Sequence, residues 1–438
     1  MIVNVIISKT YRELNLYFRE PIHKNSIHLV TNSFVTSGLG FIFWVIAARF
    51  YGSYELGLAS AIVSSMNLLT VLSLLGFNIS LIKFLPNSSG KENLINSCFT
   101  LDLCAASIIS IIFLLGINTF SPELSFLKEN LIFSIFFIIF TATGVIGLLL
   151  NSIFIANRLS KIVLLKDSIF GILKIPLTIF AIFLGAFGIF FAWGIALMIS
   201  SIIGMGLLFK IIPQYKPRVL IEKELIRDMF HFSFWNYIAH IFSLAPASIL
   251  PIMIANVLSA DAAAYFYISW MIANLLFSIP AQSTQSLLAE CSNFDQKIKE
   301  NAEKTLKFIL LLIILPIVII LFMGDKLLLL FGREYSIESF KLLQLLAISA
   351  IPYAINSLFI SIKRVKKETT SVVLIYFIMA FIALMGSYML VPFMGIIGVG
   401  IAWLFGNLVT STAIVFKVAK DKLGKHLISF EGFVYGRK

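Results

Sequence analysis

The sequence contains little charge. Of its 438 residues, 13% are charged and 59% are hydrophobic, and the mean hydropathy is +0.97. Soluble chains carry about 25% charged residues, and a much smaller share cannot cover a surface that faces water. The composition therefore excludes an ordinary soluble protein and places the chain in a lipid bilayer.

Cysteine is scarce as well. The three cysteines, Cys98, Cys104 and Cys291, stand in apolar segments without CxxC or CxxH spacing. This pattern excludes a disulfide scaffold, a zinc site and an iron–sulfur site. We expect a protein without a metal or another cofactor.

The features of an enzyme are missing too. No loop between apolar runs exceeds about 20 residues, which is too short for a soluble catalytic domain. Gly90 and Lys91 hint at a phosphate loop, but Leu85 and Glu92 stand where that motif needs Gly and Ser or Thr. We predict that the chain is not an enzyme. A membrane enzyme acting on lipids through single buried residues stays open, and a glycan ligase or polymerase ranks last because the outer loops are short.

The charge that is present is mostly positive. The chain has 34 Lys and Arg against 22 Asp and Glu, a net charge of +12. With so little polar surface, basic loops beside a membrane explain this excess better than nucleic-acid binding does. We therefore expect contacts with membrane lipids and none with nucleic acid.

Long apolar runs dominate the sequence. Runs of roughly 20 residues are typical of membrane-spanning helices, and twelve are found, near 29–49, 56–82, 95–118, 131–156, 168–185, 188–210, 230–257, 263–289, 305–323, 341–362, 370–391 and 394–416. Almost no polar residue separates runs five and six at Leu184–Gly188, or runs eleven and twelve at Val391–Gly395. Tight hairpins are expected at both places.

Lysine and arginine alternate between the loops. The N-terminal segment, the loops after even-numbered spans and the C-terminal segment together hold 28 of the 34, and the loops after odd-numbered spans hold five. Basic loops face the cytoplasm. Both chain ends are therefore predicted in the cytoplasm, in a multi-pass protein of the cell (inner or plasma) membrane.

The spans divide into two sets of six. The predicted parts are a cytoplasmic interfacial segment at 1–28, an N-terminal lobe at 29–212, a basic cytoplasmic linker at 213–229, a C-terminal lobe at 230–418 and a basic cytoplasmic tail at 419–438. A shift of about 207 residues aligns the halves in span length and register. Six is even, so both lobes enter from one side and the repeat is parallel. The predicted fold class is all-α, with twelve transmembrane helices in two parallel six-helix lobes.

One lysine stands inside an apolar run. Lys174 lies in span five, just before Pro176, and an ionisable group at that depth suggests function. Three explanations stay open. Lys174 could reach the cytoplasmic interface, serve as a cavity cation for an anionic head group, or pair structurally with Asp102 or Asp167.

Two charges hold equivalent places in the halves. Lys83 ends span two and Glu290 ends span eight. We hypothesise that they form an inner gate that closes in the outward-open state. The alternative is that both only mark helix ends among the lipid head groups.

Further candidates are polar but mostly uncharged. Arg49 ends span one and suits either a phosphate or an interfacial anchor. Spans two and eight carry runs of Ser, Asn, Gln and Thr that suit a wet, sugar-binding cavity or simply hold helices together. Pro246, Pro251 and Pro280 are predicted hinges. The candidate substrate-binding residues are Arg49, Asn78, Lys174, Gln282 and Gln285.

Four segments carry a resemblance to a known family. AARFYG at 47–52, ELGLASA at 55–61, LLGFN at 74–78 and LIKFLP at 81–86 resemble polysaccharide-biosynthesis flippases, the O-antigen-type members of the multidrug and oligosaccharidyl-lipid exporter superfamily. The resemblance implies a multidrug-exporter-like fold that moves polyprenyl-diphosphate-linked oligosaccharide from the cytoplasmic to the outer leaflet. It also implies a basic cavity, for which Arg49 is the best-matched residue.

We accordingly predict a flippase that works by alternating access in surface polysaccharide biosynthesis, as a monomer. The alternative is a cation-coupled multidrug antiporter of the same architecture. An antiporter favours carboxylates deep in its cavity, and spans one, two and seven contain none. Coupling to Na⁺ or H⁺ stays open for either function.

Overall fold

The computed structural model describes residues 21–88, 90–213, 215–291 and 298–434. For residues 21–24, 26–27, 285–291, 298–301 and 420–434 it describes the backbone alone. Most of the interfacial segment predicted at 1–28 therefore lies outside the described residues.

Helices make up the described part of the chain, which contains no strand. Twelve helices have 21 residues or more: α2 (Pro21–Phe50), α3 (Ser53–Ser73), α5 (Lys91–Leu115), α8 (Leu131–Ala156), α9 (Ser160–Phe180), α10 (Ala186–Ile211), α11 (Lys223–Val257), α12 (Ala260–Cys291), α13 (Ile298–Leu328), α14 (Arg333–Val365), α15 (Thr369–Met394) and α16 (Ile396–Val434). Each coincides with one predicted apolar run, so the all-α, multi-spanning fold class is confirmed.

Eleven of these helices are long and apolar enough to cross a membrane by length and composition. The remaining one is α9, because Lys166, Asp167 and Lys174 fall within its most apolar stretch. The helix also begins at Ser160, earlier than the predicted start at 168. Lys166 was counted as a loop residue and in fact lies inside a helix.

The second predicted span is not one continuous helix. α3 ends at Ser73 and the short α4 (Phe77–Phe84) follows it. Between them Leu75 has φ +48° and Gly76 has φ +84°, left-handed values that end an α-helix. A side chain at Gly76 would lie 2.6 Å from Ser233 Oγ on α11, so the break allows close helix contact.

Short helices lie in three of the connections, between α4 and α5, between α5 and α8, and between α9 and α10. They are α6 (Ile117–Phe120), α7 (Phe126–Glu129) and the 3₁₀ turns η1 (Leu85–Asn87), η2 (Pro122–Leu124) and η3 (Ile182–Leu184).

The two hairpins predicted from the sequence are present and share one conformation. Gly185 precedes α10 with φ +56° and ψ −138°, and Gly395 precedes α16 with φ +58° and ψ −147°. In both turns the glycine carbonyl accepts a hydrogen bond from the third residue on, Gly188 or Gly398. The same turn thus recurs 210 residues apart, close to the predicted repeat offset.

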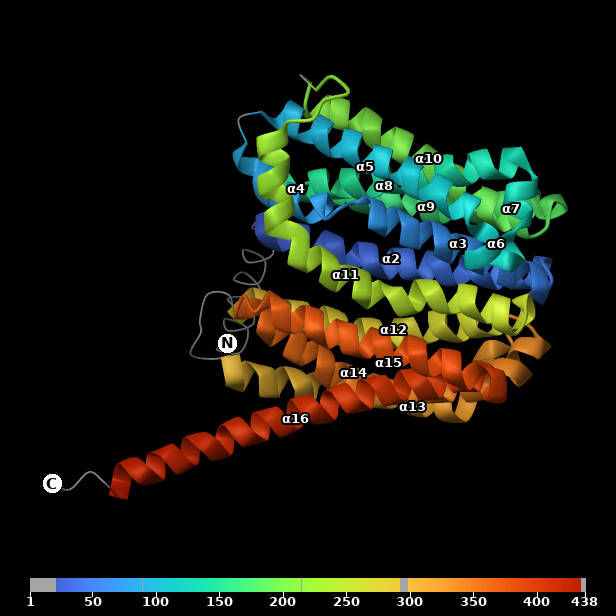
Figure 1. Ribbon diagram of the computed structural model, residues 1–438. Helices are drawn as coiled ribbons and strands as arrows, with labels where there is room; N and C mark the ends of the chain where they lie inside the picture. Colours follow the sequence, from blue (N-terminus) through green and yellow to red (C-terminus); the bar gives the residue numbers. More distant parts are fainter. Residues whose placement is uncertain (1–20, 89, 214, 292–297, 435–438) are drawn as a thin grey trace, which may run out of the picture. The chain divides into compact units, whose positions relative to one another are not determined.

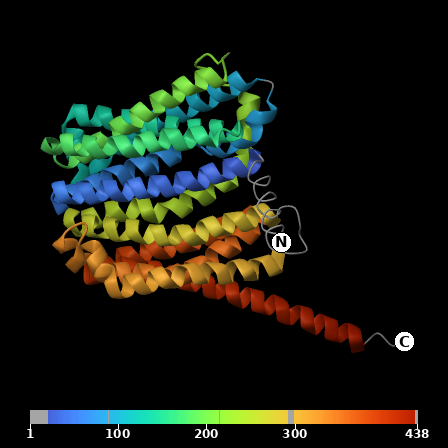
Figure 2. The same cartoon turned by 180° about the vertical axis from the view of Figure 1, so that it is seen from behind.

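By internal contacts the chain divides into two compact units, Met1–Tyr267 and Ile268–Lys438. In the N-terminal unit, α9 packs against α2 and α10, α8 against α5 and α10, and α3 against α11. In the C-terminal unit, α14 packs against α13 and α16, and α15 against α16. Figures 1 and 2 show most long helices of each unit running in roughly the same direction, with α16 inclined to its neighbours. The predicted division into 29–212 and 230–418 stays a prediction.

Candidate functional site

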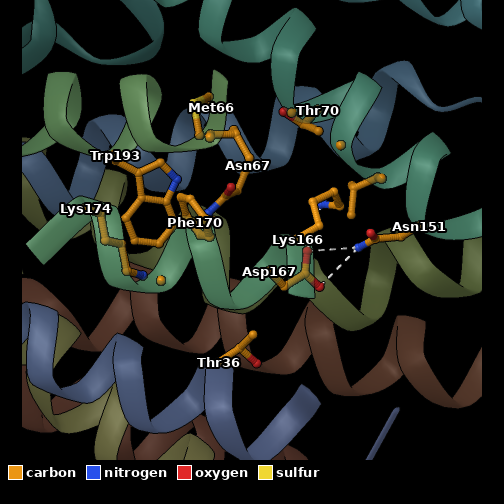
Figure 3. A pocket seen from close by; sticks show the side chains of 15 residues that line it. Thr36, Met66, Asn67, Thr70, Asn151, Lys166, Asp167, Phe170, Lys174 and Trp193 are labelled. Carbon is orange, nitrogen blue, oxygen red and sulfur yellow. Dashed lines mark hydrogen bonds and ion pairs between the residues drawn. The ribbon is translucent and has the colours of Figure 1, made fainter. Parts of the chain in front are cut away.

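The N-terminal unit contains a partly open cavity of about 300 Å³ between α2, α3, α8, α9 and α10, lined by both apolar and polar residues. Figure 3 shows its side chains. Its polar and aromatic lining consists of Thr36, Asn67, Thr70, Asn151, Lys166, Asp167, Phe170, Lys174 and Trp193.

Glycines on α8 make room for this cavity. Gly144, Gly147, Leu148 and Asn151 line it, at spacings that place them on one helix face. A Cβ at Gly144 would lie 2.8 Å from Thr70 Oγ1, and one at Gly147 would lie 3.4 Å from Ser201 Oγ. Larger residues at these positions would therefore fill the cavity or displace α3 and α10.

Lys174 lies in a cage of three aromatic rings. Its ammonium is 4.2 Å from the ring centroid of Trp193, 4.7 Å from that of Phe170 and 4.8 Å from that of Phe43. The residue is only 3% exposed. Cation–π attraction of this kind stabilises an ammonium group without a carboxylate beside it.

The cage walls also contact one another. The Trp193 ring lies edge-on to Phe43 at 5.6 Å and to Phe170 at 5.2 Å between centroids. Because the rings come from α2, α9 and α10, the cage exists only when these three helices are packed together.

Asp167 is the centre of a separate network at the other end of the cavity. Lys166 Nζ pairs with Asp167 Oδ1 at 2.7 Å, and Asn32 Nδ2 donates to Oδ2 at 2.9 Å. Asn151 Nδ2 is 3.4 Å from Oδ1 and 3.3 Å from Oδ2. The Ser200 hydroxyl donates to the Lys166 carbonyl. The carboxylate therefore receives three donors and connects α2, α8 and α9.

Of the three explanations for Lys174, the structural pairing with Asp167 or Asp102 is not found among the described residues. Asp167 pairs with its chain neighbour Lys166. Asp102 is fully buried on α5, and neither of its carboxyl oxygens has a hydrogen-bond partner in the described part of the chain. Lys174 also does not extend to an interface, since its ammonium lies among the three rings.

The lining therefore contains one basic side chain without a carboxylate partner. Lys166 and Asp167 neutralise each other, and Lys174 is the third charged residue of the lining. Such a cavity suits a ligand with an anionic group and polar substituents. Among the described residues no group of three or more His, Cys, Asp or Glu could hold a metal ion.

The end of α2 holds α9 in place beside the cavity. The Tyr51 hydroxyl donates to the Thr178 carbonyl at 2.6 Å, and the Thr178 hydroxyl donates to the Lys174 carbonyl at 2.8 Å. Burial, and then the negative charge of Glu55, raises the pKa of Tyr51 to about 12. The phenol thus remains a hydrogen-bond donor at neutral pH.

Of the predicted substrate-binding residues, Lys174 alone lines this cavity. Arg49 is exposed in the last turn of α2, and Asn78 is half-buried on α4. Gln282 is half-buried on α12 in the C-terminal unit, and the side chain of Gln285 lies outside the described residues. The structure does not bring these residues together in the N-terminal cavity, and their roles stay predictions.

Of the two residues of the predicted gate, the structure describes the side chain of Lys83 alone. The Lys83 ammonium lies 3.5 Å from the ring centroid of Phe232 on α11. The side chain of Glu290 lies outside the described residues. The pairing of Lys83 with Glu290 stays a prediction.

Sequence reasoning missed most of the cavity lining. Asp167, Phe170, Gly171 and Lys174 follow one another at spacings of three, one and three residues, which places them on one face of a helix. A charged and aromatic face within an apolar run was the signal that could have identified them. Nothing comparable marked Asn151 or Trp193.

The comparisons with known proteins agree with one another. A sequence model of the family described as "Polysaccharide biosynthesis protein" matches residues 22–288. A curated relative, the "Putative O-antigen transporter" of Shigella flexneri, is 25% identical over 267 residues, which cover 57% of this chain and 63% of that protein. The match thus spans less than two thirds of the relative's length.

Solved structures share the fold. The lipid II flippase MurJ in an inward closed conformation has a TM-score of 0.75 and 18% identity, covering 90% of this chain and 87% of that one. An inward-facing multidrug resistance transporter of the MATE family has a TM-score of 0.71 and 15% identity, and the match covers 89% of this chain and 95% of that one. At these identities the likeness concerns the fold alone.

Proposed function

The chain belongs to the polysaccharide biosynthesis protein family, and on that premise we propose that it is a flippase for a lipid-linked glycan. In this proposal it moves a polyprenyl-diphosphate-linked oligosaccharide from the cytoplasmic to the outer leaflet for surface polysaccharide biosynthesis. The chain is a multi-pass membrane protein, so both the lipid tail and the protein surface can remain in the bilayer while the polar head group crosses.

The observation that carries the proposal is the one lysine of the N-terminal cavity that has no carboxylate partner in the described structure. Lys174 is buried, is held by three rings and has no carboxylate beside it in the described structure. A diphosphate supplies the anionic partner, and a hydrogen bond between an ammonium and a phosphate is about twice as strong as one between neutral groups. The neighbouring amides and hydroxyls suit the sugar that the diphosphate carries.

The multidrug antiporter receives less support from the same cavity. A cationic drug needs an available carboxylate, whereas Asp167 already accepts from Lys166, Asn32 and Asn151. Lys174 would also repel such a drug. In the C-terminal unit, α15 is related to α9 by the repeat offset and carries no charged residue.

For the transport cycle we propose alternating access without covalent chemistry. The two halves rock against each other, with Pro246, Pro251 and Pro280 inside α11 and α12 as hinges. Both chain ends face the cytoplasm in this scheme, and the protein works as a monomer.

The proposal is tested by deleting the gene in its native host and measuring which leaflet holds the lipid-linked glycan. A membrane-impermeant glycan-modifying enzyme distinguishes the leaflets, and the wild-type gene on a plasmid is the control. We expect accumulation on the cytoplasmic leaflet and loss of the surface glycan. Normal sidedness together with new sensitivity to cationic drugs would replace the flippase with the antiporter.

A further inference from the structure

The Asp167 network fixes the orientation of two amide side chains. A carboxylate accepts hydrogen bonds and cannot donate them, so Asn32 and Asn151 must turn their NH₂ groups toward Asp167. Their carbonyl oxygens then point away from it. Asn32 Oδ1 and Asn151 Oδ1 are both buried and have no donor in the described structure.

The two amides differ in one respect. Asn151 lines the N-terminal cavity, whereas Asn32 is not part of its lining. Beside Asn151, the space next to Gly147 is bounded by Ser201 Oγ, which is also buried without a partner. A buried acceptor without a donor is unfavourable, and occupation by a donor-bearing ligand relieves that cost.

This acceptor-rich end is distant from the cation. Asp167 and Lys174 are seven residues apart on α9, roughly 10 Å along the helix axis at 1.5 Å per residue. Figure 3 shows Asn151 with Asp167 on one side of the cavity and Lys174 with Trp193 on the other. A diphosphate and the first sugar ring attached to it extend over a comparable length.

We propose that Asn151, held by Asp167, is a specificity-determining residue that accepts a hydrogen bond from the sugar next to the diphosphate. The inference rests on the proposed function and adds the orientation of the head group. The diphosphate lies at Lys174, and a hydroxyl or N-acetyl N–H of the first sugar lies at Asn151 Oδ1. A metal cation does not suit this end, because Lys166 already supplies the positive charge beside Asp167.

The test compares two probes on purified protein in nanodiscs: undecaprenyl diphosphate and undecaprenyl-diphosphate-linked N-acetylglucosamine. The test variant is Asn151→Leu. The matched control is Asn32→Leu, which removes the same kind of amide donor from Asp167 without changing the cavity lining. Gly147→Ala is a second test variant, because its methyl group narrows the same end and removes no hydrogen bond.

We expect Asn151→Leu to lower the affinity for the sugar-bearing probe about five- to tenfold, which is the effect of one neutral hydrogen bond. The affinity for undecaprenyl diphosphate should stay within twofold of the wild-type value. Gly147→Ala should lower the affinity for the sugar-bearing probe in the same selective way, and Asn32→Leu should change the affinity for neither probe. If Asn151→Leu does not fold, the result with Gly147→Ala decides.

Two failures are distinguishable. Equal binding of both probes by wild type and by the two test variants would overturn the sugar subsite and leave the proposed function in place. The same holds if Asn32→Leu reproduces the selective loss. Failure of wild-type protein to bind either probe would overturn the proposed function itself.

Discussion

At the scale of single residues, the cavity separates two kinds of buried charge. Lys166 is neutralised by Asp167, whereas Lys174 has only aromatic rings around it. The first arrangement is structural, because it saturates a carboxylate and joins three helices. The second leaves a charge that an incoming anion can use.

Replacement of Lys174 tests this distinction. We expect Lys174→Gln to reduce transport of the lipid-linked glycan at least tenfold, because hydrogen bonds to charged groups contribute about 1.5–3 kcal/mol. The measurement is surface glycan in the complemented deletion strain. Lys161→Gln, at an exposed position of the same helix, is the control and should retain wild-type levels. Full activity of Lys174→Gln would remove this lysine from the site.

The ion pair makes a prediction about stability. Asp167→Asn leaves the Lys166 ammonium buried without a counter-charge, and loss of one partner of a buried pair costs about 3–5 kcal/mol. We expect a free energy of unfolding lower by about 3 kcal/mol, measured by denaturation of the purified protein in detergent. The double variant Lys166→Met with Asp167→Leu should be less destabilised, since it buries no unpaired charge. Equal loss in both would show that the amide contacts of Asp167 dominate.

At the scale of elements, apolar runs predicted where helices form better than where they break. The run at 56–82 contains no charged residue and was predicted as one span, but the helix breaks at Leu75 and Gly76. Apolar content does not report this break, which lies where Gly76 closely approaches Ser233 and Tyr237 of α11. The start of α9 was predicted too late because two charged residues, Lys166 and Asp167, were assigned to a loop. In the structure they form an ion pair and lie within the helix.

The break can be tested by Gly76→Ala. The substitution places a methyl group 2.6 Å from Ser233 Oγ and requires a side chain at φ +84°. We expect a loss of about 2 kcal/mol in the free energy of unfolding, from strain of the kind that costs roughly 1–3 kcal/mol. Gly90→Ala is the control, because no atom lies within 4 Å of its added methyl group. A neutral Gly76→Ala would mean that α4 and α11 separate easily.

At the scale of the whole molecule, the alternation of basic loops predicts the orientation in the membrane. We expect a cysteine at Pro217, between α10 and α11, to face the cytoplasm, and a cysteine at Glu123, between α6 and α7, to face outward. The background replaces Cys98, Cys104 and Cys291 with Ser. The measurement is labelling of intact cells with a membrane-impermeant maleimide.

Only Glu123→Cys should react in intact cells, and Pro217→Cys should react after the membrane is opened. The reverse pattern would invert the topology and the direction of transport. Reaction of both positions in intact cells would contradict the number of spans between them.

The sequence alone was enough to predict that this protein lies in a lipid bilayer, that its fold is all-α and which family it resembles. Low charge and long apolar runs require a bilayer, because backbone groups in lipid must be paired within helices, and both Gly hairpins were readable from local composition. Lys174 could likewise be recognised as a cation inside a span.

What the lysine contacts was decided by tertiary structure. Phe43 and Trp193 come from α2 and α10, and Asn32 and Asn151 reach Asp167 from α2 and α8. A periodic pattern shows which face of one helix is polar, but it does not show which residues of other helices meet that face. The pairing of Asp167 with Lys166, which leaves Lys174 without a carboxylate partner in the described structure, follows from packing rather than from composition.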